Sequence, residues 1–211
     1  MIPQIRDHRS IRKYSSRPVP EEVLREVLEA GTRASTTGNM QLYSMVVTTS
    51  EALKKELSPC HFNQPCVMQA PVIITFCADI HRFSTWCRQR GAEPRYDNFV
   101  WFTNAVIDTV LASQNVALEA EAHGLGICSL GTTTYTADRI AEILKLPKGV
   151  IPVTTLVMGY PDGMPPLTDR LPLEAVVHRE TYGEYTPERI DELWREREAS
   201  EETAGLLEVN G

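Results

Sequence analysis

The strongest constraint on the fold is a helix predicted over residues 98–123, because its apolar side chains lie on nearly every side. The apolar positions are Val100, Trp101, Phe102, Ala105, Val106, Ile107, Val110, Leu111, Ala112, Val116, Ala117 and Leu118. Intervening polar residues such as Asn104 and Asp108 exclude a bilayer-spanning helix. The helix must therefore be covered by a core or by another subunit, and in a chain of 211 residues a subunit contact is a reasonable explanation.

Helices and strands mix along the rest of the chain, which favours an α+β or α/β fold over an all-α or all-β one. Helix-start signals and apolar periodicity predict helices over residues 20–31, 50–57, 136–144 and 186–198. β-Branched runs predict strands over residues 44–49, 72–78, 153–158 and 175–178. In residues 79–97 the apolar side chains recur at no regular helix or strand spacing. We interpret this segment as an excursion between core elements that covers a site. We expect one domain over residues 1–198 and a flexible C-terminal tail over residues 199–211.

The charge balance narrows the class of partner. The chain has 28 acidic and 21 basic groups and a net charge of −7, which argues against nucleic acid and against a polybasic membrane anchor. Met1–Tyr14 contains no apolar core of a secretory signal, and the five cysteines form no CxxC or zinc-type pattern. We therefore expect a cytoplasmic protein with reduced thiols that binds a small molecule, with no bound metal.

The first candidate for binding chemistry is the segment from His8 to Tyr14 (H-R-S-I-R-K-Y), which places five polar donors within seven residues. The planar fork of an arginine suits phosphate, and a serine hydroxyl or a neutral imidazole can complete the cradle. The alternative is a solvated basic start with no ligand.

Two further segments carry polar groups in loops. Ser35–Gln41 presents hydroxyls, a glycine and two amides, which suit a heterocycle with mixed donors and acceptors, although an ordinary helix-to-strand loop has a similar composition. Arg170 lies in the proline-rich segment Asp169-Arg170-Leu171-Pro172. Its simplest alternative role is a local ion pair with Asp169 or another neighbour.

Several common catalytic patterns are absent from the sequence. No G-x-G-x-x-G follows a strand, since Gly124-Leu125-Gly126 ends a predicted helix, and neither a Walker A motif nor G-x-S-x-G occurs. Cys60 and His61 could be imagined as nucleophile and base, but adjacent residues rarely face each other.

Taken together, the segments resemble the FMN-dependent nitroreductase family. Residues 8–14 resemble its opening pattern of Arg or His followed by R-S-x-R/K-x-F/Y, and residues 35–43 (S-T-T-G-N-M-Q-L-Y) resemble its P-S-S-x-N-x-Q-P-W loop. Residues 105–131 are similar to its central helix and the turn that follows. Gly159-Tyr160-Pro161 and Arg170-Leu171-Pro172 match its late signatures. The resemblance spans residues 5 to 180, with five pieces in the right order.

The resemblance implies a homodimer with a central mixed, mostly antiparallel sheet flanked by helices, and two FMN molecules at the subunit boundary. His8, Arg9, Ser10 and Arg170 would hold the phosphate, and Arg12 would lie near the pyrimidine edge, where a cation suits the negative charge of reduced flavin. Thr36, Thr37, Asn39 and Gln41 would come from the other subunit. The turn Ser129-Leu130-Gly131 would present backbone N–H groups to the ring, with Gln64 as a further contact.

The implied activity is ping-pong hydride transfer from NADPH or NADH through FMN to a nitroaromatic, a quinone or another flavin, without a catalytic side chain. Thr168 stands where many members have lysine, and Leu42-Tyr43 replaces Pro-Trp. Candidate walls over the flavin are Phe62, Trp86, Tyr96, Phe99 and Trp101. The alternatives on the same scaffold are a reductive dehalogenase and a flavin-fragmenting enzyme, and outside enzymes a flavin-binding carrier or redox sensor.

Overall fold

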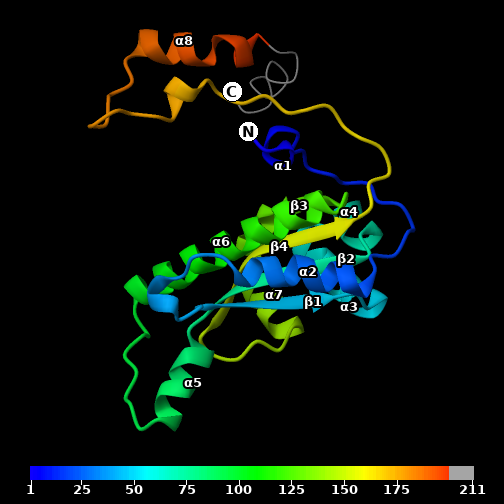
Figure 1. The fold of residues 1–211 in the computed structure, drawn as a ribbon, viewed down its shortest axis with the longest axis vertical. Coiled ribbons are helices and arrows are strands. Elements are labelled where there is room, and N and C mark those ends of the chain that lie inside the picture. The colour runs from blue at the N-terminus through cyan, green and yellow to red at the C-terminus, as the bar shows by residue number, and fades with distance from the viewer. Residues whose placement is uncertain (200–211) are drawn as a thin grey trace. The chain divides into compact units, whose positions relative to one another are not determined.

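The computed structural model describes residues 1–199, and its centre is a four-stranded sheet with the order β1-β2-β4-β3 (Figure 1). The strands are β1 (Tyr43–Thr48), β2 (Val72–Asp79), β3 (Gly126–Leu130) and β4 (Val150–Gly159). All three strand pairings are antiparallel, and a parallel bridge joins Ser10 to Ile127 of β3. The α+β fold with a mostly antiparallel sheet is confirmed, and three of the four predicted strands match to within three residues at each end.

Eight α-helices lie within the described residues. They are α1 (Pro3–Arg6), α2 (Glu21–Thr32), α3 (Glu51–Leu57), α4 (Pro65–Gln69), α5 (His81–Gln89), α6 (Phe99–Ala122), α7 (Ala137–Ile143) and α8 (Pro187–Glu198). The expected starts are confirmed at Pro20, where two glutamates open α2, and at Thr186, whose hydroxyl accepts from Arg189 N. One expectation was wrong: the predicted strand at 175–178 is absent, and the 3₁₀ turn η4 (Leu173–Ala175) ends there instead. The excursion over residues 79–97 contains the helix α5, which was not predicted, and its role as a cover over a site stays a prediction.

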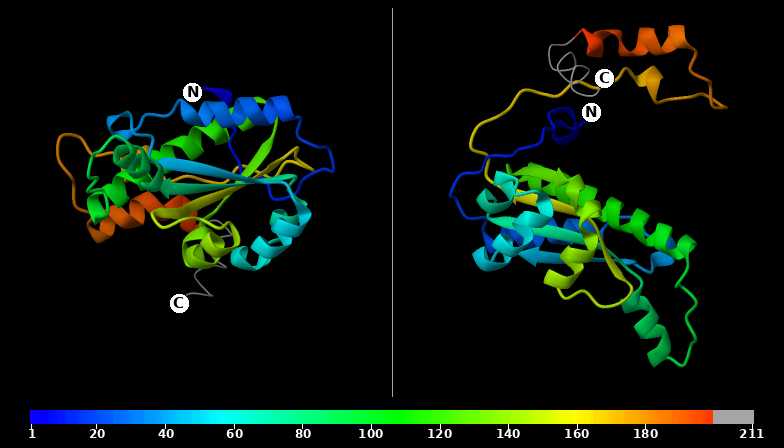
Figure 2. Two further views of the ribbon diagram at one scale, coloured as in Figure 1. Left: turned by 90° about the horizontal axis from the view of Figure 1, so that it is seen from below. Right: turned by 180° about the vertical axis from the view of Figure 1, so that it is seen from behind.

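The sheet is covered on both faces (Figure 2, left). The helices α2 and α6 lie over one face, where Val27 and Val116 pack with Ile74 and Met158 of the central strands. The helices α3, α4 and α7 lie on the other side. Because both faces are covered, all eight residues of β2 are buried, which explains why its sequence is a continuous apolar run with no alternation.

The long helix α6 begins after Asn98, whose side-chain oxygen accepts a hydrogen bond from Trp101 N (3.2 Å). Only one side of α6 is buried by the core. The buried positions are mainly small or polar: Ala105, Asp108, Thr109, Ala112, Val116, Ala117 and Ala120. The opposite side leaves Val100, Phe102, Ile107, Val110 and Leu111 exposed, so the core does not account for the whole apolar surface of this helix.

The chain divides into two compact units, one formed by Met1–Pro166 and the other beginning at Leu167. The sheet and α1 to α7 belong to the first unit, whereas η4 and α8 belong to the second. The single domain expected over residues 1–198 stays a prediction. The expected tail of residues 199–211 falls, from residue 200 on, outside the described residues. In the part of the chain that is described, no helix has both the length and the apolar character that a membrane crossing requires.

Candidate functional site

The N-terminal segment is fixed to the edge of the sheet. Ile11 N donates to the carbonyl of Ile127 (2.8 Å), and the Tyr14 hydroxyl donates to the carbonyls of Ile11 (2.5 Å) and Val157 (3.2 Å). Burial raises the pKa of Tyr14, so its hydroxyl stays a neutral donor. A Cβ on Gly126 would lie 2.5 Å from Ile11 Cγ1 and 2.6 Å from Ile11 Cβ, so this contact requires glycine. The polar residues on either side of Ile11 are therefore held in place by the backbone.

A pocket of about 340 Å³ lies beside this segment. Ser10, Arg12 and Lys13 line it on one side, and residues 162–165 line it on the other. Arg12 and Lys13 oppose one carboxylate, Asp162, so the lining carries an excess of positive charge that suits an anion. Arg9 contributes its guanidinium to the frame, since Nη1 donates to the carbonyl of Pro165 (3.1 Å).

His8 is held by a residue that the sequence analysis did not identify. Its Nδ1 lies 2.7 Å from Oε1 of Glu121 in α6, and the two side chains are 33% and 14% exposed. Burial raises the pKa of Glu121, while the nearby His8 opposes this shift. The position of Glu121 on a mostly apolar helix could have drawn attention to it, but nothing in the sequence pairs it with a residue 113 positions away.

The predicted loop over residues 36–41 is shaped by a second residue of α6. The buried carboxylate of Asp108 accepts hydrogen bonds from Thr37 N (2.8 Å, Oδ1) and Leu42 N (3.1 Å, Oδ2). Arg82 of α5 donates to the carbonyls of Gln41 and Tyr43. Gly38, Asn39 and Gln41 all have positive φ angles, which these contacts hold in place.

The side chains of the loop remain available for binding. Asn39 and Gln41 are exposed and share one hydrogen bond, from Gln41 Nε2 to Asn39 Oδ1 (3.2 Å), while Thr36 and Thr37 are half-buried. Neither Asp108 nor Arg82 was predicted as a support for this loop. The loop is thus preorganised, with amide groups facing outward.

A single chain does not bring the loop and the N-terminal segment together. Asp108 holds the loop and Glu121 holds His8, and these two residues are thirteen positions apart on α6. With a rise of 1.5 Å per residue, the two anchoring points lie about 20 Å apart along the helix axis. None of the residues that line the pocket beside Arg12 belongs to the loop.

The structure does connect the segments that carry Gln64 and Gly131. Gln64 precedes α4 directly, and Gly131 opens the 3₁₀ turn η3 (Gly131–Tyr135) after β3. His61 Nδ1 lies 2.9 Å from the hydroxyl of Thr132, which ties the two segments together. Ser129 is exposed and Leu130 is buried, and the space that a side chain on Gly131 would occupy is open within 4 Å.

Cys60 and His61 are not arranged as a nucleophile and its base. Burial raises the pKa of the Cys60 thiol and lowers the pKa of His61 to about 4, so both groups are neutral at neutral pH. The hydrogen-bond partner of His61 is Thr132, and His61 Nε2 is buried without a partner in the described chain. The pair is part of the packing beneath η3.

The buried His61 makes stability sensitive to acid. The unfolded chain takes up a proton on this imidazole near the ordinary pKa of 6.5, whereas the folded chain does so only near 4. Lowering the pH through this window therefore favours the unfolded state. Between about pH 7 and about pH 5, we expect the wild type to lose about 2 kcal/mol more than a His61→Gln variant, measured by urea denaturation. Equal losses in the two proteins would contradict this, and the same replacement at the exposed His81 controls for the loss of an imidazole.

Arg170 lies in the second unit. Its Nη1 donates to the hydroxyl of Thr168 (2.6 Å) and to the carbonyl of Asp169 (2.7 Å), while the carboxylate of Asp169 pairs with Arg197 (2.9 Å). The guanidinium is thus held locally through backbone and hydroxyl contacts. Its role beside His8, Arg9 and Ser10 stays a prediction.

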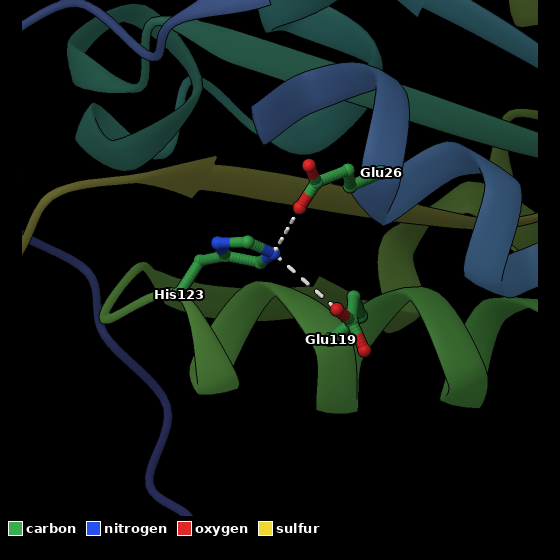
Figure 3. Close-up of side chains that lie close together, drawn as sticks. All are labelled: Glu26, Glu119 and His123. Carbon is green, nitrogen blue, oxygen red and sulfur yellow. Dashed lines mark ion pairs between the residues drawn. The ribbon is translucent and has the colours of Figure 1, made fainter. Parts of the chain in front are cut away.

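A separate cluster of metal-ligand types lies between α2 and α6 (Figure 3). His123 Nε2 lies 3.1 Å from Oε2 of Glu26 and 3.3 Å from Oε1 of Glu119. The side chains of Glu26 and Glu119 are 62% and 41% exposed, so solvent screens this network and its contribution to stability is small. We interpret it as a surface ion-pair network.

Comparison with known proteins places the chain among flavin enzymes. A family model described as the nitroreductase family matches residues 5–160. The chain is 33% identical over 183 residues to an FMN reductase (NADPH) of Bacillus subtilis strain 168, which covers 86% of this chain and 74% of that protein. It is 34% identical over 177 residues to an oxygen-insensitive NADPH nitroreductase of Salmonella typhimurium strain LT2, which covers 83% and 71%. The crystal structure of an oxidoreductase from Bacteroides fragilis NCTC 9343 superposes with a TM-score of 0.96 and 46% identity, over 99% of this chain and 85% of that one.

Proposed function

The chain belongs to the nitroreductase family, and from that premise we propose that it is an FMN-dependent oxidoreductase that uses NADPH or NADH to reduce a small-molecule acceptor. Nitroaromatics, quinones and free flavins are the acceptor classes. The observation that carries the proposal is the cationic pocket beside Ser10 and Arg12, held against β3 by the close contact of Ile11 with Gly126.

The residues present fit the cofactor. His8, Arg9, Ser10 and Arg12 offer imidazole, guanidinium and hydroxyl donors over five consecutive positions, a set that suits a phosphate and an electron-rich ring edge. The buried, partnerless Oε2 of Glu121 adjoins the same segment through His8. When bound, FMN supplies the redox step, accepting a hydride from the nicotinamide and passing electrons to the acceptor. The side chains of this protein therefore bind and orient, and the mechanism requires no protein acid, base or nucleophile.

Arg12 provides the direct test of the cofactor site. Its guanidinium is exposed at the rim of the pocket, and we expect Arg12→Ala to weaken FMN binding by about tenfold or more because a charge-assisted contact is lost. Fluorescence titration of the flavin-free protein measures this dissociation constant. Lys55→Ala removes an exposed cation from α3 and serves as the control. An Arg12 variant with unchanged affinity and unchanged flavin potential would remove this residue from the site.

The active form is a homodimer in which each site uses both chains. Two observations support this: about 20 Å of α6 separates the anchors of the loop and of His8, and one side of α6 exposes a run of large apolar side chains. In a dimer formed through α6, the loop over residues 36–41 of one protomer would approach the N-terminal segment of its partner.

A charge on the exposed side of α6 is expected to disrupt this dimer. Ile107 is 49% exposed, and Ile107→Glu would bury a carboxylate in the contact, which converts the dimer to monomer and lowers FMN retention together. Sedimentation measures the mass and absorbance measures the bound flavin. Ile151→Glu places the same charge on an exposed apolar position of β4 (42% exposed) and should leave the mass unchanged. An Ile107→Glu protein that remains dimeric and yellow would contradict this contact.

The cytoplasm is the proposed location. All five cysteines are buried free thiols, in keeping with a reducing compartment. The net charge of −7 and the small size of the pocket favour small molecules over nucleic acid or membrane lipids as partners.

A further inference from the structure

Glu121 contacts the N-terminal segment, and packing does not explain the free energy that its buried carboxylate costs. Its side chain is 14% exposed, Oε1 lies 2.7 Å from His8 Nδ1, and Oε2 is buried without a partner in the described chain. A buried carboxylate with a hydrogen bond to only one of its oxygens lowers the free energy of unfolding. Glutamine or an apolar residue would suit a purely structural position better. A buried carboxylate of this kind beside a pocket is a candidate for a role in a binding site.

The contact determines what His8 can offer a ligand. When the Glu121 carboxylate is ionised it only accepts hydrogen bonds, and Nδ1 of His8 then carries the proton that lies between the two groups. In a doubly protonated imidazole both ring nitrogens are donors, and Nε2 can then donate to an anion while Nδ1 donates to Glu121. Within residues 1–199 Nε2 has no hydrogen-bond partner, so this nitrogen is open to a bound anion.

We propose that Glu121 is a positioning residue that holds His8 as a donor to the phosphate of FMN and thereby selects FMN over riboflavin. The assignment rests on the proposed function, since it needs a flavin phosphate at His8. Glu121 does not touch the ligand in this arrangement. It acts through His8 by fixing the orientation and the proton of the imidazole, and it has no role at the isoalloxazine ring.

Location supports the same assignment. Glu121 and Arg9 line a pocket of about 260 Å³ that shares Ile11 and Met164 with the pocket beside Arg12. The side of the N-terminal segment that faces Glu121 therefore adjoins the cationic pocket. Glu121 is in the last turn of α6, one position before its final residue, where the sheet contact of Gly126 also fixes the backbone.

Comparing FMN with riboflavin tests whether Glu121 positions His8 or has a purely structural role. Riboflavin has the ring system of FMN but lacks the phosphate. Dissociation constants for FMN and for riboflavin would be measured by fluorescence titration of the flavin-free wild type, Glu121→Ala, Glu121→Gln and His8→Ala. For Glu121→Ala we expect FMN to bind about tenfold more weakly and riboflavin to bind as the wild type does. Glu121→Gln keeps an acceptor oxygen for Nδ1 and should recover part of the loss. In the His8→Ala background, Glu121→Ala should add nothing further.

Four results would overturn the assignment. Equal weakening of FMN and riboflavin in both Glu121 variants would show a structural role. Additive losses for Glu121→Ala and His8→Ala would show that Glu121 does not act through His8. A wild-type protein that binds riboflavin but gains nothing from the phosphate would place His8 elsewhere while leaving flavin binding intact. A wild type that binds neither flavin would overturn the proposed function, and this assignment with it.

Discussion

Gly126→Ala is expected to abolish stable flavin binding and to destabilise the protein by about 3 kcal/mol or more. The added Cβ would lie 2.5 Å from Ile11 Cγ1 and 2.6 Å from Ile11 Cβ, well inside van der Waals contact. Rotation of the Ile11 side chain cannot relieve the clash, because the Cβ of Ile11 is itself too close. The backbone must separate, which breaks the Ile11–Ile127 hydrogen bond and exceeds the usual cost of overpacking.

Separation of these backbones would move Ser10 and Arg12, which flank Ile11, away from the pocket they line. Urea denaturation measures the loss of stability, and absorbance of the purified protein measures the retained FMN. Gly183→Ala is the matched control, since its added Cβ would have its nearest neighbour at 3.7 Å. A Gly126→Ala protein with wild-type stability and full flavin content would show that the N-terminal segment does not depend on this contact.

Asp108→Ala is expected to destabilise the protein by about 2–5 kcal/mol, because two backbone N–H groups lose a charged acceptor at once. Thr37 N and Leu42 N would be left without this partner, one half-buried and one buried. The positive φ angles at Asn39 and Gln41 would then lack one of their main supports, and the loop would no longer be preorganised.

The effect of Asp108→Ala on FMN affinity shows whether the loop belongs to the binding site or only contributes to stability. If the loop completes the site of the partner protomer, Asp108→Ala should weaken FMN binding even under conditions where the protein remains folded, which circular dichroism verifies. Asp108→Asn keeps one acceptor oxygen and should show a smaller loss. Asp191→Ala, at an exposed position of α8, controls for the loss of a carboxylate. Full FMN affinity in a folded Asp108→Ala protein would exclude the loop from the site.

The sequence predicted those helices and strands whose apolar residues form a clear pattern within the element itself. The helix over residues 98–123 matches α6 to within one residue at each end, and Val72–Ala78 lies within β2. The predicted strand at residues 175–178 failed because a β-branched pair, Val176-Val177, carried the prediction without a neighbouring strand to pair with. The helix α5 was missed because its nine residues include few apolar positions.

The supports of the candidate site could not be predicted, for a physical reason. Periodicity assigns Asp108 and Glu121 to α6, but their partners lie 71 and 113 positions away and are selected by the tertiary fold. The resemblance proposed Arg12, Asn39 and Gln41 as site residues by pattern alone, without the contacts that shape their segments. The close contact between Ile11 and Gly126 could not be predicted either, because the sequence pattern assigns this glycine to the end of a helix.

The most direct test of the account is anaerobic reduction of the FMN-loaded protein. The flavin-free protein would be incubated with excess FMN, freed of unbound cofactor, and mixed with NADPH or NADH without oxygen. We predict that the protein retains the yellow flavin absorbance, that at least one donor bleaches it rapidly, and that a nitroaromatic or a quinone restores it. A protein that retains no FMN, or retains it but is reduced by neither donor, would contradict the proposed oxidoreductase.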